Sequence, residues 1–127
     1  MRCLGCNLVG VDLANANLSE ENLTEVNLSG ADLRRANFRS LNLQSTTFRG
    51  SNLVEADLRW AYLNGANLSG KDLRGTNLKG VSFEGSTLTR VNLTKADLTG
   101  ANLGNTELDA VIFCNTKTPW GEDNSGC

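Results

Sequence analysis

A period of five residues runs through almost the whole chain. From Leu8 to Phe113 every fifth residue is leucine or phenylalanine, which makes 22 units without a break in register. The residue two places before each of these centres is small (Cys, Ala, Val, Ser or Thr) in 19 units, the exceptions being Glu21, Leu41 and Lys71. The residue immediately before the centre is Asn or Asp in 16 units. Any fold for this chain must therefore direct the side chains of all 22 centres toward one apolar interior.

Neither of the two standard secondary structures accounts for this period. On an α-helix a step of five residues turns the side chain by about 140°, so the centres would spiral around the cylinder and form no apolar face. On an unbroken strand an odd step would send successive centres to opposite faces. A short extended segment followed by a turn in every unit does account for it, because each turn redirects the chain and the next centre again points inward. The pattern therefore predicts an all-β chain that coils around its own leucines.

The residues around each centre fit such a coil. Alternation along an extended segment places the centre and the small residue two places before it inside, and the Asn or Asp between them outside. Glycine occupies the second place after the centre in nine units, where a turn with positive φ favours it. Glu21 and Lys71 stand at inward positions. For Lys71 we expect either that the stem lies along the wall with the ammonium at a corner, or that the coil is distorted there.

Units such as Ala31-Asp32-Leu33, Ala66-Asn67-Leu68 and Ala101-Asn102-Leu103 resemble those of the pentapeptide-repeat family, which read A(D/N)LxG. The resemblance covers residues 6–115. It implies a right-handed quadrilateral β-helix with four units, or 20 residues, in each coil and about 5.5 coils in all. With neighbouring coils about 4.8 Å apart, the rod would be about 26 Å long. Residues 1–5 would then be an N-terminal cap segment, residues 6–115 the β-helix and residues 116–127 a non-repetitive capping tail.

Composition narrows the class of protein further. A chain of 127 residues with 39% apolar and 20% charged residues suits one folded domain, and it has no run of 18 apolar residues that could span a membrane. It contains no histidine, the commonest general base and metal ligand. We therefore expect no catalysis, no cofactor and no metal. The centres should form a core ladder that includes Leu8, Leu33, Phe38, Phe48, Leu68, Phe83 and Phe113.

Charge is distributed unevenly along the chain. Residues 33–95 contain ten Lys or Arg against four Asp or Glu, whereas residues 1–32 and 96–127 each carry a net charge of −4. If residues 20 apart stack, Arg39, Arg59 and Lys79 lie on successive coils with Trp60 beside them. This face is the candidate interaction surface, because a cluster of cations attracts an anionic partner. The alternative interpretation is an ordinary solvated face, on which Trp60 covers the arginine stems.

Four cysteines stand at the two ends of the repeat, and the length of the rod limits how they can pair. A disulfide needs Cα atoms within about 7 Å, so only Cys3 with Cys6 and Cys114 with Cys127 are possible within one chain. We expect the second pair to tie the tail across the last coil, with free thiols as the alternative. Cys3 and Cys6 fit a structural cap better than a redox motif or half of a zinc site, because the chain offers no further ligands nearby.

Disulfides would place the protein in an oxidising compartment, and free thiols would favour the cytoplasm. The N-terminus has no basic region followed by an apolar stretch, so a mature protein whose targeting peptide has been removed fits the sequence. Short family members with cysteine-bearing caps are associated with cyanobacteria and the thylakoid lumen. The resemblance therefore implies the thylakoid lumen or the periplasm.

Two functions from different classes are compatible with these features. The first is a non-catalytic structural or interaction module, a rigid rod that binds an unknown protein partner as a monomer or a weak end-to-end oligomer. The second is suggested by longer family members that mimic DNA and regulate a type II topoisomerase. Such mimics should be strongly acidic and dimerise through a C-terminal helix, whereas this chain has a net charge of only −2 and a tail with Pro119. We expect no nucleic-acid binding, because a single aromatic residue lies on the basic face and the pI is about 5.1.

Overall fold

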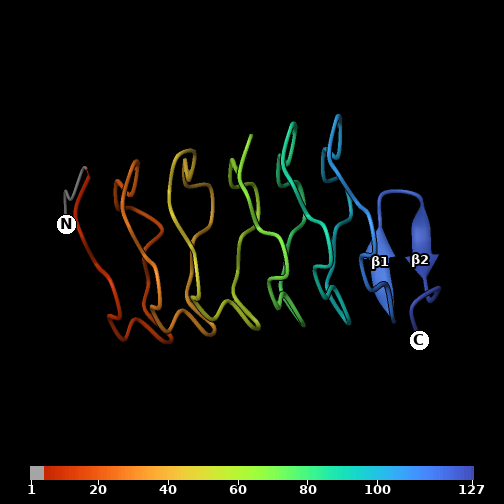
Figure 1. The fold of residues 1–127 in the computed structure, drawn as a ribbon, viewed down its shortest axis with the longest axis horizontal. Helices are drawn as coiled ribbons and strands as arrows, with labels where there is room; N and C mark the ends of the chain where they lie inside the picture. Colours follow the sequence, from red (N-terminus) through yellow and green to blue (C-terminus); the bar gives the residue numbers. More distant parts are fainter. Residues whose placement is uncertain (1–4) are drawn as a thin grey trace.

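The computed structural model describes residues 5–127. The chain winds in stacked coils around one long axis, with the N-terminus at one end of the rod and the C-terminus at the other (Figure 1). Among the described residues the two regular strands are β1 (Thr116–Thr118) and β2 (Gly121–Asp123), which form an antiparallel pair at the C-terminal end. The body of the rod consists of short extended segments joined by turns.

Residues 20 apart in the sequence stack on one another. Parallel bridges join Asn17 to Asn37 and Asn37 to Asp57, and the same spacing recurs along the rod. The N–H of Leu8 donates to the carbonyl of Asn27 at 2.8 Å, and similar bonds hold each coil to the next. Four units therefore complete one coil, as the resemblance implies.

A tight turn forms each corner of the coil. The carbonyl of Leu28 accepts the N–H of Ala31 at 3.1 Å, and corresponding bonds close the other turns. The residue two places after the centre has positive φ in every unit except that of Leu18, as Gly30 does at 69°, which is the geometry of a type II turn. Among the described residues twelve non-glycine residues also adopt this conformation, among them Trp60 at 62°. Glycine is therefore favoured at the corner but is not required there.

The Asn or Asp before each centre has a structural role that the sequence pattern alone did not reveal. Its Oδ1 accepts the backbone N–H two residues later, as in Asn27 with Ser29 at 3.0 Å and Asp97 with Thr99 at 3.0 Å. These side chains point outward, as predicted, and also satisfy a backbone donor at the start of the turn. The hydrogen bond explains why short side chains with a carbonyl or carboxylate oxygen dominate this position.

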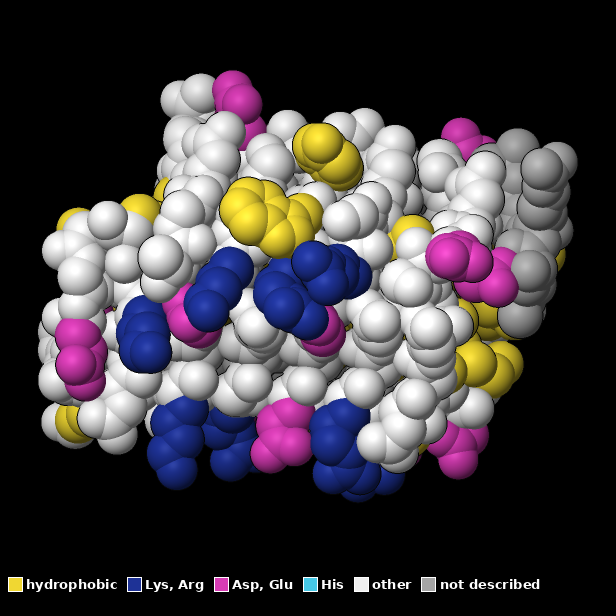
Figure 2. All heavy atoms as spheres, turned by 180° about the vertical axis from the view of Figure 1, so that it is seen from behind, with side chains coloured by type: hydrophobic (Ala, Val, Ile, Leu, Met, Phe, Trp, Pro, Cys, Tyr) yellow, Lys and Arg dark blue, Asp and Glu magenta, His cyan; other side chains and the backbone are white. Residues whose placement is uncertain are grey.

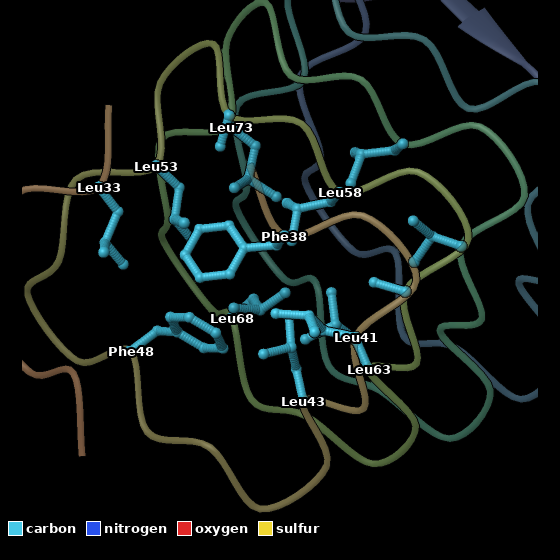
Figure 3. Close-up of a cluster of buried hydrophobic side chains, with 14 of the residues drawn as sticks. Leu33, Phe38, Leu41, Leu43, Phe48, Leu53, Leu58, Leu63, Leu68 and Leu73 are labelled. Carbon is cyan, nitrogen blue, oxygen red and sulfur yellow. The ribbon is translucent and has the colours of Figure 1, made fainter. Parts of the chain in front are cut away.

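The leucine and phenylalanine centres fill the interior in ladders (Figure 3). Leu33, Leu53 and Leu73 form one ladder, and Phe38 meets Phe48 edge to face with ring centroids 6.4 Å apart. Of the predicted core ladder, the structure buries Leu33, Phe38, Phe48, Leu68 and Phe83. Leu8 and Phe113 lie in the end coils and are only partly buried, because each has a neighbouring coil on one side alone.

The coil continues past the predicted end of the repeat at residue 115. Lys117 bridges to Asp97 in the usual register, and the Thr116 hydroxyl donates to the carbonyl of Leu93 at 2.8 Å. Strand β1 therefore serves both as the last rung of the stack and as one strand of the terminal hairpin. The described part of the chain contains no helix with the length and apolarity needed to cross a membrane.

Candidate interaction surface

The three stacked cations of the candidate surface follow three buried centres on consecutive coils. Arg39, Arg59 and Lys79 come directly after Phe38, Leu58 and Leu78, so alternation turns their side chains outward. Bridges from residue 37 to 57 and from 57 to 77 hold these rungs in register. The structure thus brings the three predicted cations onto one side of the rod.

Two of these cations already have acidic partners. The Arg59 guanidinium binds Asp57 with Nη2 2.6 Å from Oδ2, and the Lys79 ammonium lies 3.6 Å from Oδ2 of Asp97. Arg39 makes no ion pair within residues 5–127. Two of the three cations are therefore paired, and Arg39 is the one without a direct ion pair among the described residues.

Trp60 lies at the corner after Arg59, and its indole rests on the next coil. A Cβ placed on Gly80 would lie 2.1 Å from Cε3 and 2.2 Å from Cζ3 of Trp60, so the ring covers the glycine backbone. The side chain is nevertheless 55% exposed. Gly80 therefore provides a flat seat that holds the indole against the rod while leaving much of it open to solvent.

Tyr62, which was not among the residues predicted for this surface, lies beside it. It follows Trp60 by two residues and its side chain is 53% exposed. Two residues span at most about 7 Å of chain, so the two aromatic residues flank one corner. The fragment Arg59-Trp60-Ala61-Tyr62 signals this grouping in the sequence, because it places the Arg, Trp and Tyr side chains that dominate binding hot spots within four residues.

The space-filling view shows exposed hydrophobic side chains in the middle of one face, directly beside a group of Lys and Arg side chains (Figure 2). A second row of Lys and Arg along the edge of this view is interrupted by an acidic residue. We refer to the exposed aromatic side chains and the cations directly beside them, without this second row, as the aromatic corner. It comprises Arg39, Arg59, Trp60, Tyr62 and Lys79.

An Asp-Leu-Arg sequence recurs at residues 32–34, 57–59 and 72–74, and in each case the arginine folds back onto its own aspartate. The Nη2–Oδ2 distances are 2.6, 2.6 and 2.7 Å. The side-chain hydrogen bond from Arg34 lowers the pKa of Asp32 to about 2, and the corresponding arginines lower the pKa values of Asp57 and Asp72. These arginines are therefore neutralised within their own units.

Acid titration should reveal these pairs. A carboxylate whose pKa is lower in the folded than in the unfolded state contributes stability above its unfolded pKa and loses it as the pH falls through its folded pKa. We expect the urea midpoint to be constant above about pH 5 and to fall between about pH 4 and pH 2. A variant with asparagine at positions 32, 57 and 72 keeps the backbone hydrogen bonds of the turns and should show a flatter profile. An unchanged slope in that variant would contradict this assignment.

Lys71 is an inward-pointing residue whose stem lies along the wall, the first of the two predicted arrangements. Its ammonium donates to the carbonyl of Phe48, to the carbonyl of Ser51 at 3.2 Å and to the Ser51 hydroxyl at 3.3 Å. Burial lowers the pKa of Lys71. Because its contacts are with neutral oxygens of the preceding coil, the structure gives this lysine a packing role. Glu21, the other inward charge, also has a buried carboxylate oxygen.

Cys6, Cys114 and Cys127, the cysteines that the structure describes, lie at the two ends of the rod, far from the aromatic corner. Cys114 and Cys127 form a disulfide with Cα atoms 4.9 Å apart. Cys6 is also disulfide-bonded, and its predicted partner Cys3 lies outside the described residues. Within residues 5–127 no three His, Cys, Asp or Glu side chains gather as ligands for a metal ion.

Comparison with known proteins places these features in a family. The family described as pentapeptide repeats (8 copies) matches the chain three times, at residues 6–44, 42–80 and 77–115. No curated protein matches the chain in sequence. Among solved structures, HetL from the cyanobacterium Nostoc sp. strain PCC 7120, a protein involved in heterocyst differentiation regulation, is similar with 28% identity and a TM-score of 0.66. The alignment covers 94% of this chain and 62% of HetL, so the chain spans about three fifths of that protein.

Two further structures show the same architecture. Rfr23 from the cyanobacterium Cyanothece 51142 is 32% identical, with a TM-score of 0.50 over 87% of this chain and 85% of Rfr23. A trypsin-treated QnrB1, a plasmid-mediated fluoroquinolone resistance protein, is 19% identical, with a TM-score of 0.64 over 98% of this chain and 78% of its own. The likeness to QnrB1 concerns the fold alone. With the repeat pattern and the stacked coils, these matches define a right-handed quadrilateral β-helix.

Proposed function

Because the chain belongs to the pentapeptide-repeat family, we propose that it is a non-catalytic interaction module that binds a protein partner through the aromatic corner. The observation that carries the proposal is Trp60, which is more than half exposed yet seated on Gly80. A large aromatic side chain held on a rigid support loses little conformational entropy on binding, and Trp, Tyr and Arg supply most hot-spot residues. The surface therefore has the composition and the rigidity of a binding site.

The charges of the aromatic corner favour an acidic partner. Arg39 makes no direct ion pair among residues 5–127, and the Lys79 ammonium is 3.6 Å from Asp97. The pKa of Asp57 is lowered mainly by its hydrogen bond with Arg59 and also by the charge of Arg39. A carboxylate on a partner could reach Arg39 without displacing an existing ion pair, and it would be attracted from a distance by the positive charge of the middle coils. We therefore propose that the partner presents acidic side chains around an apolar pocket that receives Trp60. The cations within this surface disfavour the DNA-mimic alternative.

Substitution of Gly80, on which the Trp60 indole rests, tests the geometry of the site without removing any of the side chains proposed to bind the partner. In Gly80→Ala the new methyl group would overlap the indole and force it off the rod. Gly100→Ala is the matched control, because it lies in the same row with φ of 73° and meets nothing closer than 4.0 Å. Both variants carry the same backbone strain, so a difference in binding between them reports the position of Trp60.

The binding experiment uses immobilised wild type and variants to retain proteins from an extract of the source organism, followed by titration with the purified partner. We expect Trp60→Ala to weaken binding about 30-fold, which corresponds to a hot spot of about 2 kcal/mol. Gly80→Ala should also weaken binding, and Gly100→Ala should bind like wild type. Equal binding by wild type and Trp60→Ala would refute the aromatic corner as the site. Loss of binding after nuclease treatment would instead indicate a nucleic acid.

We also propose an oxidising compartment, the thylakoid lumen or the periplasm, with the cytoplasm as the alternative. Disulfides at both ends of the rod support this location, because reducing compartments do not maintain them. Alkylation of the unreduced protein from its native source, followed by peptide mapping, tests it. A disulfide between Cys114 and Cys127 is the expected result, and four alkylated cysteines would favour the cytoplasm.

A further inference from the structure

The two ends of the rod carry backbone groups that the repeat normally pairs. Within the stack the N–H of most centres donates to a carbonyl 19 residues ahead, as Leu88 does to Glu107 at 2.8 Å. Among the centres from Leu8 to Leu98 only Leu23, Phe48 and Leu53 lack this bond within residues 5–127. In the last coil the N–H of Leu108 and the N–H of Phe113 have no such acceptor within residues 5–127. In the first coil the N–H of Asp12 has no acceptor among those residues. Unpaired groups of this kind are a template for another chain.

The unpaired groups of the two ends are complementary. Continuing the register by one coil would bring the carbonyl of Asn7 of a second copy to the N–H of Leu108, and the carbonyl of Asp12 of that copy to the N–H of Phe113. The N–H of the same Asp12 would meet the carbonyl of Val111. These are the bonds that the chain forms internally, for example from Asp32 to the carbonyl of Val11 at 3.0 Å. The partly buried Leu108 and Phe113 would gain the apolar neighbour that the inner centres have.

The C-terminal tail occupies the place where a further coil would begin. Strand β2 pairs with the free edge of β1. The N–H of Gly126 donates to the carbonyl of Phe113 at 2.7 Å, and a Cβ on Gly126 would lie 2.9 Å from the backbone nitrogen of Phe113. Trp120 packs edge to face on Phe113 with ring centroids 5.8 Å apart. The disulfide from Cys127 to Cys114 fastens the end of this tail to the same rung.

We propose that the C-terminal edge of the rod is a docking surface for the N-terminal coil of a second copy, and that the disulfide-tied tail blocks it. A hairpin with three-residue strands is marginally stable alone, so the disulfide is a large part of what holds it in place. A dithiol reductant would break this disulfide and release the C-terminal tail. It transfers two electrons and two protons to the disulfide, Cys114 and Cys127 become thiols, and the reductant becomes a disulfide.

The salt dependence of association distinguishes end-to-end docking from docking of one end on the middle of another copy. Residues 1–32 and 96–127 each carry a net charge of −4, so ends that dock on each other repel at low ionic strength and associate more readily when salt screens them. Docking of an acidic end on the basic middle of another copy would show the opposite salt dependence. The sign of the salt effect therefore identifies the surface.

Sedimentation velocity of the full chain tests the proposal. Reduction would also open the disulfide at Cys6. The C-terminal tail is therefore released selectively by substituting serine for both Cys114 and Cys127. We expect the oxidised wild type to remain monomeric and the double variant to associate, more strongly at about 0.5 M than at about 0.02 M NaCl. Far-UV circular dichroism checks that the coils remain folded. A double variant that stays monomeric at both salt concentrations overturns the proposal.

A second substitution tests whether the N-terminal edge of the rod makes the proposed contact. Asp12→Pro, made in the double variant, removes the outward N–H that would donate to a second copy, and proline is compatible with the edge of a sheet. Asp12→Ala is the matched control, because like proline it removes the charge and the Oδ1 that accepts the N–H of Ala14 at 3.1 Å, and it keeps the outward N–H. We expect the proline variant to associate at least about tenfold more weakly than the alanine variant. Equal association constants would exclude this edge as the docking surface.

A third variant displaces the C-terminal tail without changing a cysteine. In Gly126→Ala the added methyl group would overlap the backbone of Phe113 and lift the end of the tail while the disulfide remains closed. We expect it to associate in the same salt-dependent manner, to a smaller extent than the serine double variant. Association of the oxidised wild type to the same extent as this variant would show that the tail blocks nothing.

Discussion

Replacing Phe38 with alanine is expected to lower the free energy of unfolding by about 3–5 kcal/mol. Phe38 is fully buried and meets Phe48 edge to face at 6.4 Å. Alanine would leave a cavity at the axis of the rod, where each coil packs on the next, and the stacked backbone could not collapse to fill it. Urea unfolding followed by circular dichroism measures the change.

Phe38→Leu is the control for this prediction. Leucine is the standard centre of the repeat, as in Leu58 on the next coil, so its substitution should cost less than about 1.5 kcal/mol. Equal losses from the alanine and leucine variants would mean that the aromatic contact with Phe48, and not the filled volume, carries the stability. A loss below about 1 kcal/mol for alanine would show that this position does not belong to the cooperative core.

Replacing Lys71 with valine is expected to stabilise the protein by about 1–3 kcal/mol. Lys71 occupies an inward position at which other units have small residues, and the stacked residue in the preceding coil is Ser51. Its ammonium contacts neutral oxygens, so its desolvation is not offset by an opposite charge. Valine fits the same position at Val26 and Val81, both fully buried. The chemical denaturation midpoint measures the gain, and a loss of more than about 1 kcal/mol would show that the lysine hydrogen bonds outweigh its burial.

The same lysine should give the wild type a characteristic alkaline response. Because burial lowers the pKa of Lys71 in the folded state, the unfolded chain binds more protons between that value and the ordinary lysine pKa of about 10.4. Stability therefore rises with pH across this interval. Lys71→Val should lack this rise, which separates the contribution of Lys71 from those of the exposed lysines.

Much of the candidate surface could be predicted from the sequence, because residues 20 apart stack wherever the period is unbroken. That rule placed Arg39, Arg59 and Lys79 on one side of the rod and Trp60 beside them. The predicted surface did not include Tyr62, because the stacking rule relates residues 20 apart and says nothing of two residues that flank the same corner. The rule could not show that Asp57 and Asp97 form ion pairs with two of these cations.

The five-residue period by itself determined the all-β coil, its inward leucines and the corners that favour glycine. It could do so because each unit repeats the same local geometry and requires the same environment. Only the tertiary structure decided which cations are paired, where the indole of Trp60 rests and where the tail lies. The reason is physical: these features depend on contacts between specific side chains of neighbouring coils, such as Trp60 on Gly80, and on a tail that follows no repeat. Periodicity describes what the units share, whereas the candidate sites arise where one unit differs from the next.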